Sequence, residues 1–179
     1  MTRGDDFSLG PADNARIEKD GERWVLVLRR ELRHSPESVW EAITDPEQLC
    51  EWAPFDADGP LNAAGNRVRL TTVGAPMPHV GETIVERAEK PHLLVYEWGG
   101  RAMRWELSPT PRGTLLMLWT SIDREYIAMG AAGWHLCFAV MDRWMSGTPV
   151  GRIVGADAMA LVEWQRLHRE YSALFSAGD

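Results

Sequence analysis

The stretch AAGWHLCFAVMDRWMSG, Ala131–Gly147, has its apolar side chains at the spacing of a helix. They recur every three or four residues along one helical face and are Trp134, Cys137, Phe138, Met141, Trp144 and Met145. Gly147 followed by Pro149 predicts the end of this helix. His135 and Cys137 are two residues apart, so they project to different sides and cannot chelate a metal together or form a catalytic pair. The stretch is therefore predicted to be an amphipathic helix that covers a sheet.

A series of strand-like segments with turn residues between them predicts that sheet. They read NRVRLTTV, ETIVERAE, HLLVYEWG, RAMRWELS and TLLMLWTSI. Gly99 and Gly100 fit a two-residue hairpin loop, and TPRG fits the next turn. The resulting register places Trp119 on the outer face, stacked on Arg104. It places on the opposite, apolar face Tyr96, Trp98, Met103, Trp105, Leu118 and Thr120.

The first third of the chain predicts one more strand and two short helices. RWVLVLRRELR alternates as a strand whose apolar face also carries Arg30. Ser35-Pro36 and Asp45-Pro46 are helix-start signals, because a capping side chain precedes a proline. A strand, two short helices, several strands and then long helices indicate an α+β fold with an antiparallel sheet.

The sequence pattern also predicts the domain organisation. Residues 1–21 are polar and without period, so they are expected to form a flexible arm that contributes little stability. Residues 22–179 are expected to form a single domain. Its last part, residues 149–175, is a helical extension in which a second helix opens near Asp157.

Composition argues against several classes of protein. The 179 residues carry a net charge of −7 with no block of Lys or Arg, so neither nucleic acid nor an anionic membrane surface is an expected partner. Two cysteines outside any CxxC pair, and no apolar segment at the start, favour a cytoplasmic protein. The five histidines lack ligand spacing and no nucleotide-binding motif occurs, so no metal and no cofactor is expected.

Two stretches resemble a known family. ELRHSPESVWEAITDPEQLCEW is similar to the start of the SRPBCC (START/Bet v-like) superfamily. YEW before a hairpin, together with AAGWHLCFAVMDRWMSG, resembles its branch of homologues of the activator of heat-shock-protein-90 ATPase, and the similarity covers residues 23–147. The part after Pro149 resembles a bacterial subgroup with an added Trp/Tyr helix.

The resemblance implies a helix-grip fold, in which a curved antiparallel sheet surrounds a long C-terminal helix. Between sheet and helix it implies a hydrophobic cavity for an apolar small molecule, roofed by Trp134, Phe138 and Met141 over Tyr96, Trp98 and Trp105. It implies no catalytic residue.

The leading hypothesis is non-enzymatic binding of a hydrophobic or amphipathic small molecule in this cavity. The expected ligand-binding residues are Arg30, Tyr96, Trp98, Met103, Trp105, Leu118, Thr120, Trp134, Phe138 and Met141, with Arg30 or Thr120 fixing the orientation. The structural alternative is that the aromatic set is packed core and that Arg30 meets a carboxylate.

Two other functions stay open. One is a cyclase or hydrolase that uses Arg30 with Tyr96 in the same cavity. The other is a co-chaperone-like interaction protein that binds a chaperone partner through the outer sheet face or the last helix. A homodimer also stays open.

Overall fold

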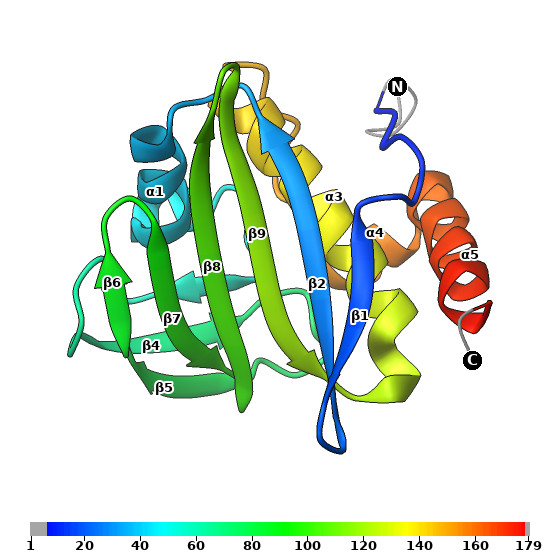
Figure 1. Cartoon of the computed structure of the whole chain (residues 1–179), viewed down its shortest axis with the longest axis horizontal. Coiled ribbons are helices and arrows are strands. Elements are labelled where there is room, and N and C mark those ends of the chain that lie inside the picture. Colours follow the sequence, from blue (N-terminus) through cyan, green and yellow to red (C-terminus); the bar gives the residue numbers. More distant parts are fainter. Residues whose placement is uncertain (1–6, 178–179) are drawn as a thin grey trace.

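The computed structural model describes residues 7–177, and Figure 1 shows a broad antiparallel sheet with helices behind and beside it. Its strands are β1 (Ala15–Asp20), β2 (Arg23–Leu32), β3 (Phe55–Ala57), β4 (Arg67–Thr72), β5 (Val80–Ile84), β6 (Arg87–Glu89), β7 (Leu93–Trp98), β8 (Arg101–Thr110) and β9 (Gly113–Ile122). Its helices are α1 (Pro36–Thr44), α2 (Pro46–Leu49), α3 (Ile127–Met145), α4 (Gly155–Met159) and α5 (Val162–Ser176), with a 3-10 turn at Arg124–Tyr126.

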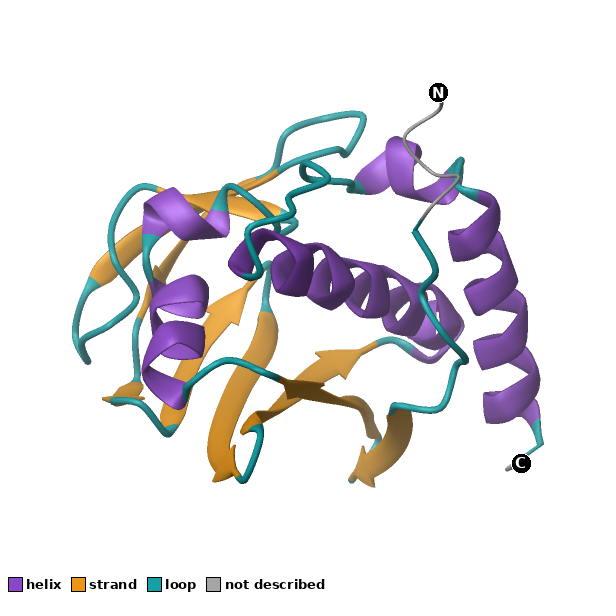
Figure 2. Ribbon diagram, turned by 90° about the horizontal axis from the view of Figure 1, so that it is seen from above, coloured by secondary structure: helices purple, strands orange, loops and turns teal. Residues whose placement is uncertain are grey.

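The large sheet has the antiparallel order β1-β2-β9-β8-β7-β6, and the small one has the order β3-β4-β5. Figure 2 shows α3 lying along one face of the strands, with α1 toward one side and α5 toward the other. A sheet that surrounds a long helix near its C-terminus, plus an extra helix, is the α+β helix-grip fold that the sequence predicts.

The register of the central hairpins is the predicted one. Gly99 and Gly100 both have positive φ, 58° and 76°, which suits a two-residue loop between twisted strands. The loop pairs Tyr96 with Met103, and the next hairpin pairs Met103 with Thr120. The sheet face that carries Met103, Trp105 and Leu118 therefore faces α3.

Trp119 lies on the other face of the sheet. It is paired with Arg104, whose guanidinium lies 5.9 Å from the centre of the indole ring. Both the outward position of Trp119 and its contact with Arg104 are thus confirmed.

The short helices begin where the capping signals place them. The Ser35 hydroxyl accepts a hydrogen bond from the backbone N–H of Ser38 at 3.2 Å, and the Asp45 carboxylate accepts one from Glu47 at 3.0 Å. The indole of Trp52 donates to the carbonyl of Ala42 at 2.9 Å, which joins the segment after α2 to α1.

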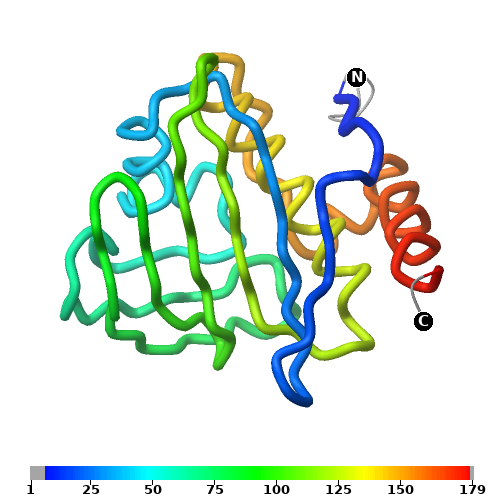
Figure 3. The backbone as a smooth tube through the Cα atoms, in the orientation of Figure 1, coloured from blue at the N-terminus to red at the C-terminus, as the bar shows by residue number. Residues whose placement is uncertain are grey.

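The expectation of a loose arm over residues 1–21 is corrected for the residues that the structure describes. Strand β1 pairs along its whole length with β2, and Leu9 is only 5% exposed. Figure 3 shows the chain passing beside α5 before it enters β1. Backbone pairing at a sheet edge needs no apolar period, so the sequence pattern did not reveal the strand. Residues 1–6 of the expected arm lie outside the described residues.

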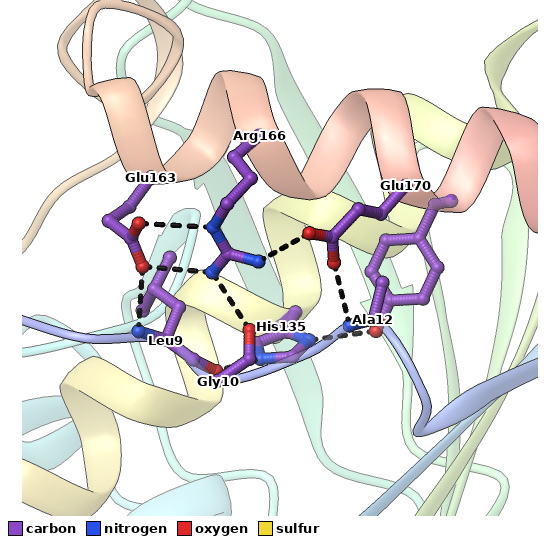
Figure 4. A network of polar contacts seen from close by, with 8 residues as sticks. Leu9, Gly10, Ala12, His135, Glu163, Arg166 and Glu170 are labelled. Atoms are coloured by element: carbon purple, nitrogen blue, oxygen red, sulfur yellow. Dashed lines mark hydrogen bonds and ion pairs between the residues drawn. The ribbon is translucent and has the colours of Figure 1, made fainter.

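A polar network fastens this N-terminal segment to α5 (Figure 4). Arg166 donates to Glu163 at 2.9 Å, to Glu170 at 2.8 Å and to the carbonyl of Gly10 at 2.8 Å. Glu163 in turn accepts from the backbone N–H of Leu9 at 3.1 Å. The hydrogen bond from Arg166 is the main cause, and the bond from Leu9 the next, that lowers the pKa of Glu163 to about 2.

His135 of α3 forms hydrogen bonds with the same segment and with α5. One ring nitrogen, Nε2, lies 2.6 Å from the carbonyl of Leu9, and Nδ1 lies 2.7 Å from the hydroxyl of Tyr171. Because a carbonyl only accepts, Nε2 carries the hydrogen and Nδ1 accepts from Tyr171. Burial lowers the pKa of His135 and favours this neutral form.

The extension forms two helices rather than one. The predicted stripe of α5 buries Trp164, Leu167 and Tyr171, and α5 packs on α3. Leu174, also assigned to that stripe, is 45% exposed.

Candidate functional site

Most of the predicted ligand-binding residues lie together, in mutual contact between the sheet and α3. They are buried, and they are Tyr96, Met103, Trp105, Leu118, Thr120, Phe138 and Met141. The ring of Trp105 lies edge-on to Trp134 at 5.7 Å, to Phe138 at 6.0 Å and to Trp52 at 6.3 Å between centroids. At these separations the rings pack against one another as in a protein core.

Two polar atoms in this cluster lack partners. The hydroxyl of Tyr96 and the indole nitrogen of Trp105 are buried without a hydrogen bond to any described residue. Burial raises the pKa of Tyr96, and the neighbouring Trp105 indole opposes this shift without reaching hydrogen-bond geometry. The hydroxyl of Thr120 is satisfied, because it donates to the sulfur of Met103 at 3.2 Å.

Arg30 connects the sheet to α3. Its guanidinium lies 3.7 Å from the carboxylate of Asp142, which also lies 2.8 Å from Nε2 of His34. This is the structural role that the sequence left open for Arg30 beside ligand binding.

An open apolar groove of about 270 Å³ lies on another side of α3, where the C-terminal extension crosses it. The hairpin between β7 and β8 contributes Trp98 and Arg101, and Pro54 also lies in its wall. The other lining residues come from α3 and the extension, and are Met129, Gly130, Gly133, Trp134, Cys137, Ile153, Val154, Gly155, Ala158, Met159 and Trp164. Of the ten predicted site residues, Trp98 and Trp134 line this groove.

The aromatic walls are held in place from behind. Trp98 donates to the hydroxyl of Thr72 at 3.2 Å and packs against Phe55 at 5.1 Å. Trp98 and Trp134 meet edge-on at 5.9 Å, and Trp164 stacks on His168. The groove is therefore largely pre-formed, as small-molecule sites usually are.

Small residues make room for the groove. A Cβ at Gly133 would meet no atom within 4 Å, so the missing side chain leaves open space beside α3. Gly155 has φ +60°, and a Cβ there would overlap the carbonyl of Gly74. This close approach, with the ion pair between Arg152 and Asp56 at 2.6 Å, fixes the path of the extension.

The extension residues of the groove were not predicted as site residues. The periodicity of Trp164 indicated only a buried helix face, and a lone glycine such as Gly133 carries no signal of its own. Among residues 7–177 there is no cluster of three metal-binding side chains, and no helix is both long and apolar enough to cross a membrane.

Solved structures share this fold. The protein EF2215 from Enterococcus faecalis matches with a TM-score of 0.65 and 13% identity, over 92% of each chain. CalU16 from Micromonospora echinospora matches with a TM-score of 0.63 and 20% identity, over 92% of this chain and 93% of its own. An AHSA1-like protein from Aeromonas hydrophila matches with a TM-score of 0.57 and 18% identity, over 70% of this chain and 94% of its own.

A search of curated protein sequences gave no significant match. The family model described as Activator of Hsp90 ATPase homolog 1-like protein matches residues 33–146. Its match ends before the extension, so the groove combines residues from inside and outside the matched segment. With well over half of its length matched, the chain belongs to the family of Activator of Hsp90 ATPase homolog 1-like proteins.

Proposed function

We propose that the protein binds a small hydrophobic or amphipathic molecule in the groove between α3 and the C-terminal extension. The observation that carries this proposal is an open, pre-formed groove with three tryptophans, Trp98, Trp134 and Trp164, in its walls. The place differs from the one expected from the sequence, because the Trp105 cluster fills the space between the sheet and α3.

The lining favours binding over catalysis. Among the described residues, the ionisable groups in the groove are Arg101 and the thiol of Cys137, and burial raises the pKa of that thiol to about 12. General acid–base catalysis needs a group that exchanges protons near the working pH, and the raised pKa of the Cys137 thiol lies far above that range. The cyclase or hydrolase alternative therefore draws no support from this groove, and neither does the chaperone-partner alternative.

The rim can adapt to its ligand. Met129 and Met159, which are 41% and 45% exposed, stand at the groove. Methionine side chains are flexible and polarizable, so they adjust to different apolar shapes. The volume lies just under the usual range of small-molecule sites, which favours a compact ligand.

Two substitutions at Gly133 test the proposal, with the uncharged fluorescent probe phenylnaphthylamine as ligand. Gly133→Leu places a branched side chain in the open space, whereas Gly133→Ala adds one methyl group and leaves most of the groove free. Both remove a glycine from a helix interior, so both are expected to fold. We expect wild type and Gly133→Ala to bind the probe and Gly133→Leu to bind it at least about tenfold more weakly.

Thermal unfolding of the three proteins controls for structural damage. A wild-type protein that does not bind the probe contradicts the proposal. Equal binding by Gly133→Leu, when that variant unfolds cooperatively, also contradicts it, because the groove would then not be the site.

A further inference from the structure

We infer that the ligand is an amphipathic anion whose acidic group binds Arg101, at the point where the apolar groove meets a second, polar groove. This inference rests on the proposed function and adds the chemical class of the ligand.

Arg101 differs from the other partly buried arginines. Four arginines are partly buried within residues 7–177. Arg30 pairs with Asp142, Arg152 with Asp56, and Arg166 with Glu163. Arg101 forms no ion pair or hydrogen bond with any described residue through its side chain. A partly buried guanidinium without a carboxylate is ready to accept an anion, since partial burial has already removed some of its hydration.

The sheet register aims Arg101 toward the apolar side. Arg101 pairs with Trp98 across the hairpin loop, and it is two residues from Met103 on the same strand. Side chains two apart on a strand share a face, so Arg101 stands at the end of the face that packs against α3. It lines the apolar groove together with Trp98 and Trp134.

Arg101 also lines the polar groove at the end of the large sheet. That groove has a volume of about 580 Å³, and its other lining residues are Glu22, Arg23, Trp24, Gly99, Gly100, Ser121, Ile122, Asp123 and Arg124. Arg101 is thus the residue that the polar groove shares with the apolar one.

Ser121 adds a hydrogen-bonding group to that groove. Its oxygen accepts the backbone N–H of Ala102 at 2.9 Å, which leaves the hydroxyl hydrogen to be donated. A ligand with its apolar body against Trp98 and Trp134 can thus place an acidic group at Arg101, with its outer oxygens toward the polar groove. Carboxylate, sulfonate and phosphate all present the oxygen atoms that a guanidinium binds.

A pair of probes that share one body tests this assignment. Anilinonaphthalene sulfonate carries a sulfonate, and phenylnaphthylamine has the same rings without it. We expect the wild-type protein to bind the sulfonate about tenfold more tightly. General electrostatics acts in the opposite direction, because the protein is negatively charged.

Three variants locate the effect. Arg101→Gln is expected to lose the preference for the sulfonate and to retain the binding of phenylnaphthylamine, and Arg101→Lys is expected to restore part of the preference. Arg104→Gln removes the same charge from an exposed position on the outer face, so it is expected to behave as wild type.

Each other outcome has a definite meaning. Equal affinity of wild type for both probes, or an undiminished preference in Arg101→Gln, overturns the assignment and leaves the proposed function standing. Failure of both probes to bind wild type overturns the proposed function and this inference with it.

Discussion

Tyr96→Phe is expected to stabilise the protein, although it deletes a polar group from the core. Tyr96 is 1% exposed, and its hydroxyl lacks a partner among the described residues. Burying an unpaired hydroxyl costs about 1–3 kcal/mol in proteins. The substitution leaves the ring in its edge-on contact with Phe55 at 6.4 Å. We therefore expect the free energy of unfolding to rise by about 1 kcal/mol or more.

Tyr171→Phe deletes the same atom and is expected to have the opposite sign. The hydroxyl of Tyr171 donates to Nδ1 of His135 at 2.7 Å. Its removal leaves a buried acceptor unsatisfied, which costs about 1–3 kcal/mol. The two variants thus compare an unpaired hydroxyl with a paired one in a single chain.

Urea unfolding at pH 7.5 measures both effects, as shifts of the midpoint at constant m-value. In a domain of this size, 1 kcal/mol corresponds to a change of about 2–4 °C in Tm. A loss of stability in Tyr96→Phe would refute the reasoning, because it would mean that the hydroxyl has a partner in the folded protein. A gain in Tyr171→Phe would refute the hydrogen bond to His135.

Three further predictions concern the N-terminal segment and the extension. Burial lowers the pKa of His135, so its stabilising contribution is complete above about pH 6.5 and is lost as pH falls through the lowered value. Urea unfolding between pH 8 and 5 should show this loss of stability in the wild-type protein. The same dependence of stability on pH in His135→Gln would contradict the prediction. Leu9→Ala should lower the free energy of unfolding by about 2–4 kcal/mol in the same assay, because Leu9 is buried. An unchanged stability would instead support the expectation of a loose arm. Gly155→Ala should lower the free energy of unfolding by more than about 1 kcal/mol and weaken probe binding. Gly59→Ala, whose added Cβ would meet no atom within 4 Å, should do neither. Equal behaviour of the two variants would contradict the contact between Gly155 and Gly74.

The central hairpins could be predicted because two local rules act together. The Gly99-Gly100 loop fixes the pairing, and the alternation of apolar side chains then decides which face is buried. The strand β1 lacks the alternation of apolar side chains. Its side chains are mostly exposed, so its place in the sheet comes from backbone hydrogen bonds and from the contacts of Leu9, which lie far away in the sequence.

The candidate site could be predicted only in part, for a different reason. An apolar sheet face reads the same whether its side chains touch one another or line a hollow. Trp105 and Phe138 satisfy the pattern and pack as core, while Trp98 and Trp134 satisfy it and reach an open groove. The difference arises from the route of the extension, which depends on contacts such as Gly155 with Gly74 that no local pattern encodes.

The position of the groove bears on which substitutions change its shape. Its inner wall, Trp98 and Trp134, lies within the segment matched by the family, and its outer wall, from Ile153 to Trp164, lies beyond it. The inner wall is constrained, because Trp134 also packs against Trp105 and a change there disturbs the core. In the outer wall Ile153 and Trp164 are buried as well, but Met159 is 45% exposed and packs less closely. Substitutions at Met159 can therefore alter the shape of the groove at a small cost in stability, whereas substitutions at Trp134 alter both the groove and the core.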